Sequence, residues 1–334
     1  MAYTNIRLAR KQLVAANVEA TRGTWAAPEA ATDVYEVADL TWPTISGETI
    51  SWDTMRNTLT RDPDAVKIGN ITASFGFSLA MPVEPAATGA AGVLDTKRGL
   101  FFEACGCAAS TSSVTHSITP SDAANSSLSM SFNVDGWEIR MRGCVGTFVD
   151  VWEAGQFRHT DFTFEGVVED CLEATALAIG NIISVTPEKV ENIAIFTIND
   201  GTNTMQSCAR RVALSCGAVQ TPYRCMSGDK GIGYYFTSDR VSGMEIICGP
   251  VHDGSANQFD DELWAAYEDS TAVTVQVAAA TPWDSPGAQM GMTGTISDLQ
   301  WVEEDGAGRW NITIAAASAT ANGEFEIQYE ESAA

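Results

Sequence analysis

Histidine, cysteine and acidic side chains could do chemistry in this sequence, but none of them stands in a catalytic or metal-binding pattern. His116, His159 and His252 are far apart, and no carboxylate or cysteine accompanies them at metal-ligand spacing. Cys105 and Cys107 are separated by one residue, which is too close for the usual zinc knuckle. We therefore expect most of the eight cysteines to behave as small buried apolar residues.

Nucleophile and phosphate-binding motifs give no better candidate. No Gly-x-Ser-x-Gly elbow is present, and no glycine-rich loop follows a strand and opens a helix. Aspartate and glutamate total 43, so some carboxylates lie close together in any fold and a catalytic pair cannot be argued. The sequence predicts no enzyme, no cofactor and no metal site.

The charge of the chain restricts its partners. The 334 residues contain 43 acidic and 19 basic side chains, a formal charge of -24. Gripping nucleic acid requires clustered cations, so we expect no specific DNA binding. Acidity is typical of a surface that must not hold DNA, or simply keeps the protein soluble. No apolar run is long enough for a bilayer, and residues 1–20 lack the apolar core of a secretory signal, so we expect no membrane partner and a mature protein that begins near Met1.

The elements that must position any site are strands, and the clearest are in residues 127–167. Three alternating polar and apolar runs are separated by turns at Asp135-Gly136 and Ala154-Gly155, which predicts a three-stranded antiparallel meander with one packed face and one solvated face. The aromatic side chains lie where the alternation predicts the core, although they could also stack on bases. They are Trp137, Trp152, Phe157, Phe162 and Phe164.

Other signals surround this meander. Residues 69–82 predict a strand, residues 94–107 a helix against the packed face, and residues 46–68 a long loop. A similar order follows in the second half, with strand signals, a polar insertion at residues 221–242, a helix at residues 259–271 with Leu263, Trp264 and Tyr267 on one side, and a final hairpin. We interpret this as a duplication, with a first domain at 1–170, a linker at 171–192 and a second domain at 193–334.

The first half resembles the tail tube proteins of long-tailed bacteriophages. Four segments carry the resemblance in order over residues 11–167: RKQLVAANVEATRGTWAAP with Glu19, Thr21, Gly23, Thr24 and Pro28; GNITASFGFSLAMP; GLFFEACGCAAS; and the meander with Gly143, Gly146, Gly155 and Phe162-Thr-Phe164-x-Gly166. The second half is similar only in the order of its elements, since Ala265-Ala266-Tyr267 stands where the family's Ala-Cys-Gly would be.

The resemblance implies two packed antiparallel sheets with a short flanking helix, a tail-tube β-sandwich present here twice in tandem. It implies a structural virion protein, assembled in the host cytoplasm, whose sheets join edge to edge into stacked rings. Six domains make the family's ring, so a duplicated chain would form a trimer with pseudo-sixfold symmetry, and an unduplicated one a hexamer. DNA would pass along an acidic lumen without specific binding, and the other partners would be the tape measure, terminator and baseplate proteins.

Two sets of residues are candidates for these contacts. Apolar side chains in the predicted loop are candidates for contact between rings: Trp52, Met55 and Leu59, with Arg56 beside them. They could equally fold back on their own domain. The polar side of the meander is a candidate for the lumen or for a subunit interface: Ser127, Ser129, Ser131, Glu138, Arg140 and Arg142. The two arginines are expected to pair with neighbours such as Glu138 or to face another subunit.

Two other functions remain open from the sequence. The main alternative is another tail component of the same ancestry, such as a tail completion protein or a ring of the baseplate hub. A carbohydrate-binding β-sandwich is the second, with surface aromatic side chains that would bind sugar.

Overall fold

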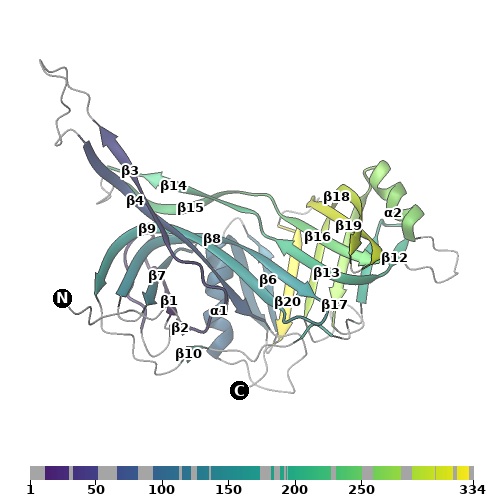
Figure 1. Cartoon of the computed structure of the whole chain (residues 1–334), viewed down its shortest axis with the longest axis horizontal. Helices are drawn as coiled ribbons and strands as arrows, with labels where there is room; N and C mark the ends of the chain where they lie inside the picture. Colours follow the sequence, from purple (N-terminus) through teal and green to yellow (C-terminus); the bar gives the residue numbers. More distant parts are fainter. Residues whose placement is uncertain are drawn as a thin grey trace, which may run out of the picture.

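The protein is mainly β, as the sequence predicts. The computed structural model describes residues 12–29, 33–51, 66–81, 93–112, 115–121, 126–134, 137–173, 182–183, 189–191, 193, 195–226, 231–249, 259–279, 288–304, 306–318 and 322–330. Its strands form a large, curved sheet of 18 strands and a separate two-stranded ribbon (Figure 1).

The first half of the large sheet is built around the predicted meander. In spatial order its main strands are β1 (Gln12–Val18), β7 (Leu128–Val134), β8 (Trp137–Glu153), β9 (His159–Glu173), β4 (Val66–Ala80) and β3 (Thr44–Ser51). All of these neighbours pair antiparallel. Two short strands, β2 (Val34–Tyr35) and β10 (Ile182–Ile183), continue the sheet beyond β1.

In the second half, the order of the strands across the sheet follows their order in the chain in the same way as in the first half. In spatial order they are β11 (Ile195–Asn199), β17 (Ala272–Ala278), β18 (Gln289–Glu304), β19 (Ala307–Ala316), β16 (Gly243–Gly249) and β13 (Cys208–Ser215). β12 (Thr204–Gln206) pairs with the other side of β11. In each half the first main strand lies at one edge, the next two at the opposite edge, and a meander fills the middle.

A helix precedes the meander in each half. α1 (Val93–Ala104) packs Phe101 and Phe102 against Phe162, and Phe102 meets Phe148 at 5.0 Å between ring centroids. The helix therefore covers the packed face, as predicted, and ends before Gly106, whose φ of 79° is a left-handed conformation that glycine adopts easily. α2 (Phe259–Glu268) buries Phe259, Leu263 and Ala266.

Trp264, which the sequence places on one side of this helix with Leu263 and Tyr267, is exposed, and its ring lies 5.8 Å from that of Tyr267. α2 lies on the same side of the joined sheet as α1. The Trp310 indole, on the strand face that also carries the buried Ile312 and Ile314, donates a 2.8 Å hydrogen bond to Asp260 of α2.

Three further segments are more regular than the sequence indicates. The polar insertion is the hairpin of β14 (Ala218–Arg224) and β15 (Ile232–Arg240), which forms the separate ribbon. The predicted loop at 46–68 is strand at both ends, since β3 runs to Ser51 and β4 begins at Val66. The predicted linker overlaps β9, which continues to Glu173.

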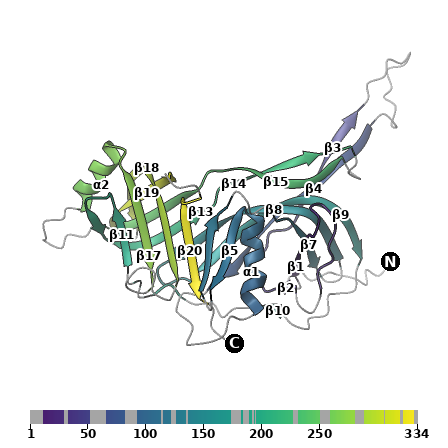
Figure 2. The same cartoon turned by 180° about the vertical axis from the view of Figure 1, so that it is seen from behind.

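A connection through β20 joins the two halves of the sheet. β5 (Cys107–Ser112) and β6 (Thr115–Pro120) form a hairpin after α1, and β6 pairs with β20 (Phe325–Glu330), which in turn pairs with β18. Figure 2 shows β20 standing between β5 and the strands of the second half. One hydrophobic core consequently extends through both halves of the chain.

Candidate functional site

The feature of this fold that bears most on function is the joint between its two halves. β8 is longer than β7, and its end, Val149–Glu153, pairs antiparallel with Arg211–Ser215 of β13. The backbone bonds continue past this ladder, because Cys216 N–H donates to Phe148 O at 3.0 Å and Ala154 N–H to Arg210 O at 2.8 Å. The centre of the joint is buried on both faces, by Val151 and Ala213 on one side and Trp152 and Leu214 on the other, whereas Arg211 and Glu153 at its end are partly exposed.

An ion pair is sealed inside this joint. Asp150 and Arg158 are completely buried, with 2.8 Å between Oδ2 and Nη2, and the Thr160 hydroxyl and Trp152 indole also donate to Asp150. Such a pair is costly to desolvate and contributes only when its remaining hydrogen bonds are made, as they are for this carboxylate. It fixes the end of β8 where β13 adds to it.

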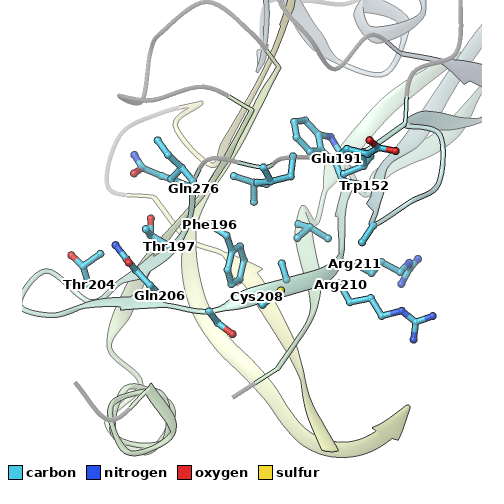
Figure 3. A pocket seen from close by; sticks show the side chains of 18 of the residues that line it. Trp152, Glu191, Phe196, Thr197, Thr204, Gln206, Cys208, Arg210, Arg211 and Gln276 are labelled. Atoms are coloured by element: carbon cyan, nitrogen blue, oxygen red, sulfur yellow. The ribbon is translucent and has the colours of Figure 1, made fainter. Parts of the chain in front are cut away.

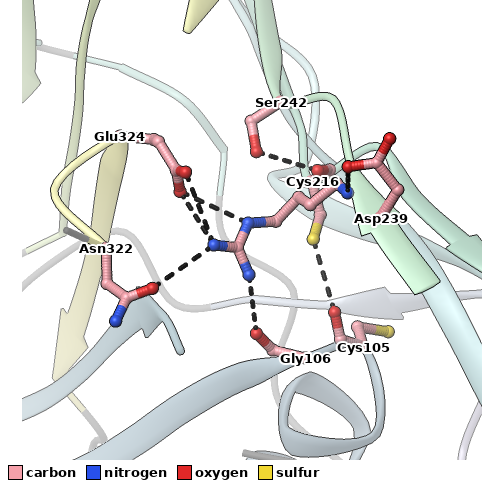
Figure 4. A network of polar contacts seen from close by, with 8 residues as sticks. Cys105, Gly106, Cys216, Asp239, Ser242, Asn322 and Glu324 are labelled. Carbon is pink, nitrogen blue, oxygen red and sulfur yellow. Dashed lines mark hydrogen bonds and ion pairs between the residues drawn. The ribbon is translucent and has the colours of Figure 1, made fainter. Parts of the chain in front are cut away.

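A second polar network ties the end of α1 to the other half (Figure 4). Arg240 of β15 donates to Gly106 O at 3.2 Å and forms an ion pair with Glu324 at 3.1 Å. Beside it, the Cys216 thiol donates to Cys105 O at 3.5 Å. These contacts lock the turn after β13 onto the first half.

The polar residues predicted to be solvated are instead inside the chain. Ser127, Ser129 and Ser131 are at most 2% exposed, and Glu138 is also buried. Glu19 covers them: it accepts hydrogen bonds from the Ser127 and Ser129 hydroxyls at 2.6 and 2.9 Å and from Gly23 and Gly143 N–H. The prediction of a solvated serine face is wrong because residues 19–27 lie over it, so these side chains are buried within the chain.

Arg140 and Arg142 have the partners that the sequence suggested. Arg140 pairs with Glu138 at 3.0 Å and stacks over Trp25, while Arg142 donates to Gly23 O and pairs with Glu169 at 2.6 Å. Hydrogen bonding to Glu138 raises the pKa of Arg140 further above its already high value. Both cations are thus used within the chain.

The β14–β15 hairpin forms an arm that reaches from the second half over the first. Ile232 and Tyr235 of β15 bury Val145 and Val167 of the first sheet, and Arg224 of β14 pairs with Glu48 of β3 at 3.0 Å. In Figure 1 the arm runs alongside β3 and β4. Local sequence patterns do not predict this packing, because the partners of the apolar residues of β15 lie far away in the chain.

Solvent does reach one face of the central strands, on the side away from the helices. We call this face the polar strip; its side chains are Ser74, Thr147, Asp161, Thr163, Glu165, Arg211, Glu245, Asp298, Gln300, Asn311 and Thr313. Arg211 is neutralised by Glu245 at 2.7 Å. Partial burial raises the pKa of the Glu165 carboxyl. The strip runs across both halves of the sheet, and its carboxylates outnumber its cations.

A hollow lies where the second sheet meets the end of β8. This cavity of about 860 Å³ is lined by Trp152, Phe196, Gln276 and the stems of Arg210 and Arg211 (Figure 3). Its arginines are engaged with carboxylates, Arg210 with Glu153 and Arg211 with Glu245. The described lining shows no nucleophile held by a base.

The other candidates add no chemistry. Trp52, Met55, Arg56 and Leu59 lie outside the described residues. Burial raises the pKa of the Cys105 and Cys144 thiols and raises that of Cys248 to about 12. A hydrogen bond with Cys216, together with burial, raises the pKa of the Cys107 thiol. Within the described ranges no group of histidine, cysteine and acidic side chains could hold a metal ion. The helices described here are too short or too polar to cross a bilayer.

A scan of protein-family models and a search of curated proteins find no match to this chain.

Proposed function

We propose that this protein is the structural subunit of a bacteriophage tail tube, in which chains join edge to edge into rings that stack around a DNA conduit. The observation that carries the proposal is the β8–β13 joint, where two sheets of the same strand order already pair edge to edge around a buried centre. An open sheet edge is an aggregation hazard, and closing a row of sheets into a ring removes it.

The repeated strand order supports a duplicated chain. β1-β7-β8-β9-β4-β3 and β11-β17-β18-β19-β16-β13 place corresponding strands in corresponding positions, and each set has a helix before its meander. A head-to-tail interface repeated by rotation closes into a ring. Three chains of two sheets each then give a trimer with pseudo-sixfold symmetry.

The polar strip is the proposed wall of the lumen, in place of the buried serines. Its carboxylates, Asp161, Glu165 and Asp298, repel phosphates, whereas its arginine is paired. A wall without free cations gives DNA no site at which counterion release would favour binding. DNA therefore passes without being held, and no enzymatic step, cofactor or membrane takes part.

Electron microscopy of the purified full-length protein tests this function. Long tubes with three chains per ring are expected. Single rings that do not stack would favour a tail completion or baseplate hub component, and six chains per ring would remove the pseudo-sixfold assignment. A monodisperse monomer at every concentration and salt would refute ring assembly, and glycan binding by that monomer would favour a carbohydrate-binding module.

A further inference from the structure

Among the strand edges without a partner strand in the described part of the chain, two correspond to the edges that meet at the β8–β13 joint. One is the outer edge formed by β3 and the residues before it, which pairs on its inner side with β4. The other is the far end of β18, beyond the point where β17 ends its pairing at Thr295. At the joint inside the chain, the edges in the corresponding places, β13 and the far end of β8, pair with each other.

The rows of residues paired across each sheet show which residue of β18 corresponds to each residue of β8 at the joint. A row across the first sheet is Phe148, Phe162 and Phe77, and the row in the same place in the second sheet is Leu299, Ile312 and Ile246. Leu299 therefore corresponds to Phe148. Two residues further along each strand, Trp301 corresponds to Asp150, the residue that lies opposite Leu214 at the joint.

The matching position on the other edge is Trp42. Leu214 pairs with Met244, and Met244 corresponds to Phe75 because these two pair with Ile314 and Phe164. Ser74 and Gly76, which flank Phe75, are bonded to Thr44 and Thr41, so residues 42 and 43 lie beside Phe75.

The side-chain contacts decide between these two residues. The Trp42 ring lies 5.8 Å from Phe132, which also contacts Phe75 on the core face. Trp42 thus takes the place of Leu214, and Pro43 is an extra residue at this point of the edge.

Burial distinguishes these positions at the formed joint from those at the open edges. Leu214 and Asp150, which meet inside the chain, are both 0% exposed. Their counterparts Trp42 and Trp301 are 51% and 54% exposed. Tryptophans at the centre of an interface are the side chains that most often dominate binding energy.

We propose that the partner of these edges is a second copy of this chain, and that residues 40–44 of one chain pair antiparallel with residues 300–303 of the next, with Trp42 opposite Trp301. The assignment rests on the proposed function, which it deepens by naming the strands and the register of the joint between chains. Thr41 then lies opposite Val302, and Leu40 opposite Glu303. The aromatic pair replaces the buried leucine and aspartate of the joint within the chain.

Disulfide trapping tests the register. Trp42→Cys and Trp301→Cys are combined in a chain whose accessible cysteines, Cys171, Cys208 and Cys225, are changed to serine. Residues directly opposite in an antiparallel ladder have Cα atoms about 4.5–5.5 Å apart, within disulfide range. Air oxidation of the assembled protein should convert most monomer into covalent multimers on a non-reducing gel.

The matched control combines Trp42→Cys with Val302→Cys, because residue 302 points to the opposite face of the ladder and its cysteine cannot reach. If tubes form but the 42–301 pair does not cross-link, the register is refuted while the tube function stands. If no rings or tubes form from the unmodified protein under any condition, the function itself is refuted.

A substitution without cysteine chemistry gives a second readout. Trp301→Lys should leave the monomer folded, with an unchanged circular dichroism spectrum and only the small loss of stability that removing its 4.9 Å contact with Trp310 causes, yet lower ring formation at least tenfold. Trp264→Lys is the control, because Trp264 is 52% exposed but lies on α2 and not on a strand edge. Equal assembly of the two variants would overturn the proposal.

Discussion

Replacing Arg158 with methionine should strongly destabilise the joint between the two halves. The substitution leaves the fully buried Asp150 carboxylate with hydrogen bonds from the neutral Thr160 and Trp152 side chains but without its 2.8 Å cation. Removing one partner of a buried pair costs about 3–5 kcal/mol, because the remaining charge stays desolvated. That is a large part of the roughly 5–15 kcal/mol that keeps a domain folded.

Urea unfolding followed by tryptophan fluorescence measures the loss. The matched control is Arg211→Met, since Arg211 and Glu245 are 2.7 Å apart but have side chains 31% and 43% exposed. Exposed pairs contribute about 0–1 kcal/mol, so equal geometry and unequal burial should give unequal costs. A combined Asp150→Leu and Arg158→Met change should recover much of the loss. A cost below about 1 kcal/mol for Arg158→Met, or one equal to that of Arg211→Met, would refute the reasoning.

Three further outcomes are expected. Glu19→Ala should lower the free energy of unfolding by about 3 kcal/mol, because it removes the acceptor of four buried hydrogen-bond donors. The control Glu191→Ala, at an exposed site, should lower it by less than about 0.5 kcal/mol. Equal urea midpoints for the two variants would contradict this prediction. Stability should fall as pH rises above about 9, because burial raises the pKa of Cys248 to about 12 in the folded chain, so that the unfolded chain binds fewer protons at these pH values. Thermal midpoints measured from pH 7 to 10 test this prediction. Cys248→Ala should make the midpoint fall less steeply with pH. Ring assembly should be faster at 0.5 M than at 0.05 M salt, because salt screens the repulsion between Asp39 on one joining edge and Asp298 and Glu303 near the other. If the rate of assembly measured by light scattering falls as salt is added, the prediction is wrong.

The meander and both helices could be predicted because their signals are local. Alternation over residues 128–164 and the turn at Gly155 fix the strands of the meander, and the burial of Phe162 and Phe164 follows from the same period. For the first helix, the spacing of Leu100, Phe101 and Ala104 predicted the buried stripe.

The failures share a different cause, which is contact between distant parts of the chain. Serines at alternate positions are typical of a solvated face, but Glu19, more than 100 residues earlier, supplies the partner that lets Ser127 and Ser129 be buried. Likewise, the apolar residues of β15 look isolated in a polar segment until Val145 and Val167 are beside them. The local sequence pattern predicts that a segment is a strand and which residues share a face. Whether the polar face is also buried depends on tertiary contacts with distant residues.

The joint within the chain also bears on how a ring would assemble. Under the proposed function, a ring of six sheets made from three duplicated chains needs only three joints between chains, since the other three joints form within single chains. A tethered pair meets at an effective concentration on the order of millimolar, so β8 and β13 pair without the entropy cost of bringing two molecules together. The edges between chains lack this advantage and are acidic, so they depend on the apolar contact at Trp42 and Trp301. Assembly is therefore most sensitive to substitution at these two residues, while folding of the chain is most sensitive at Asp150 and Arg158.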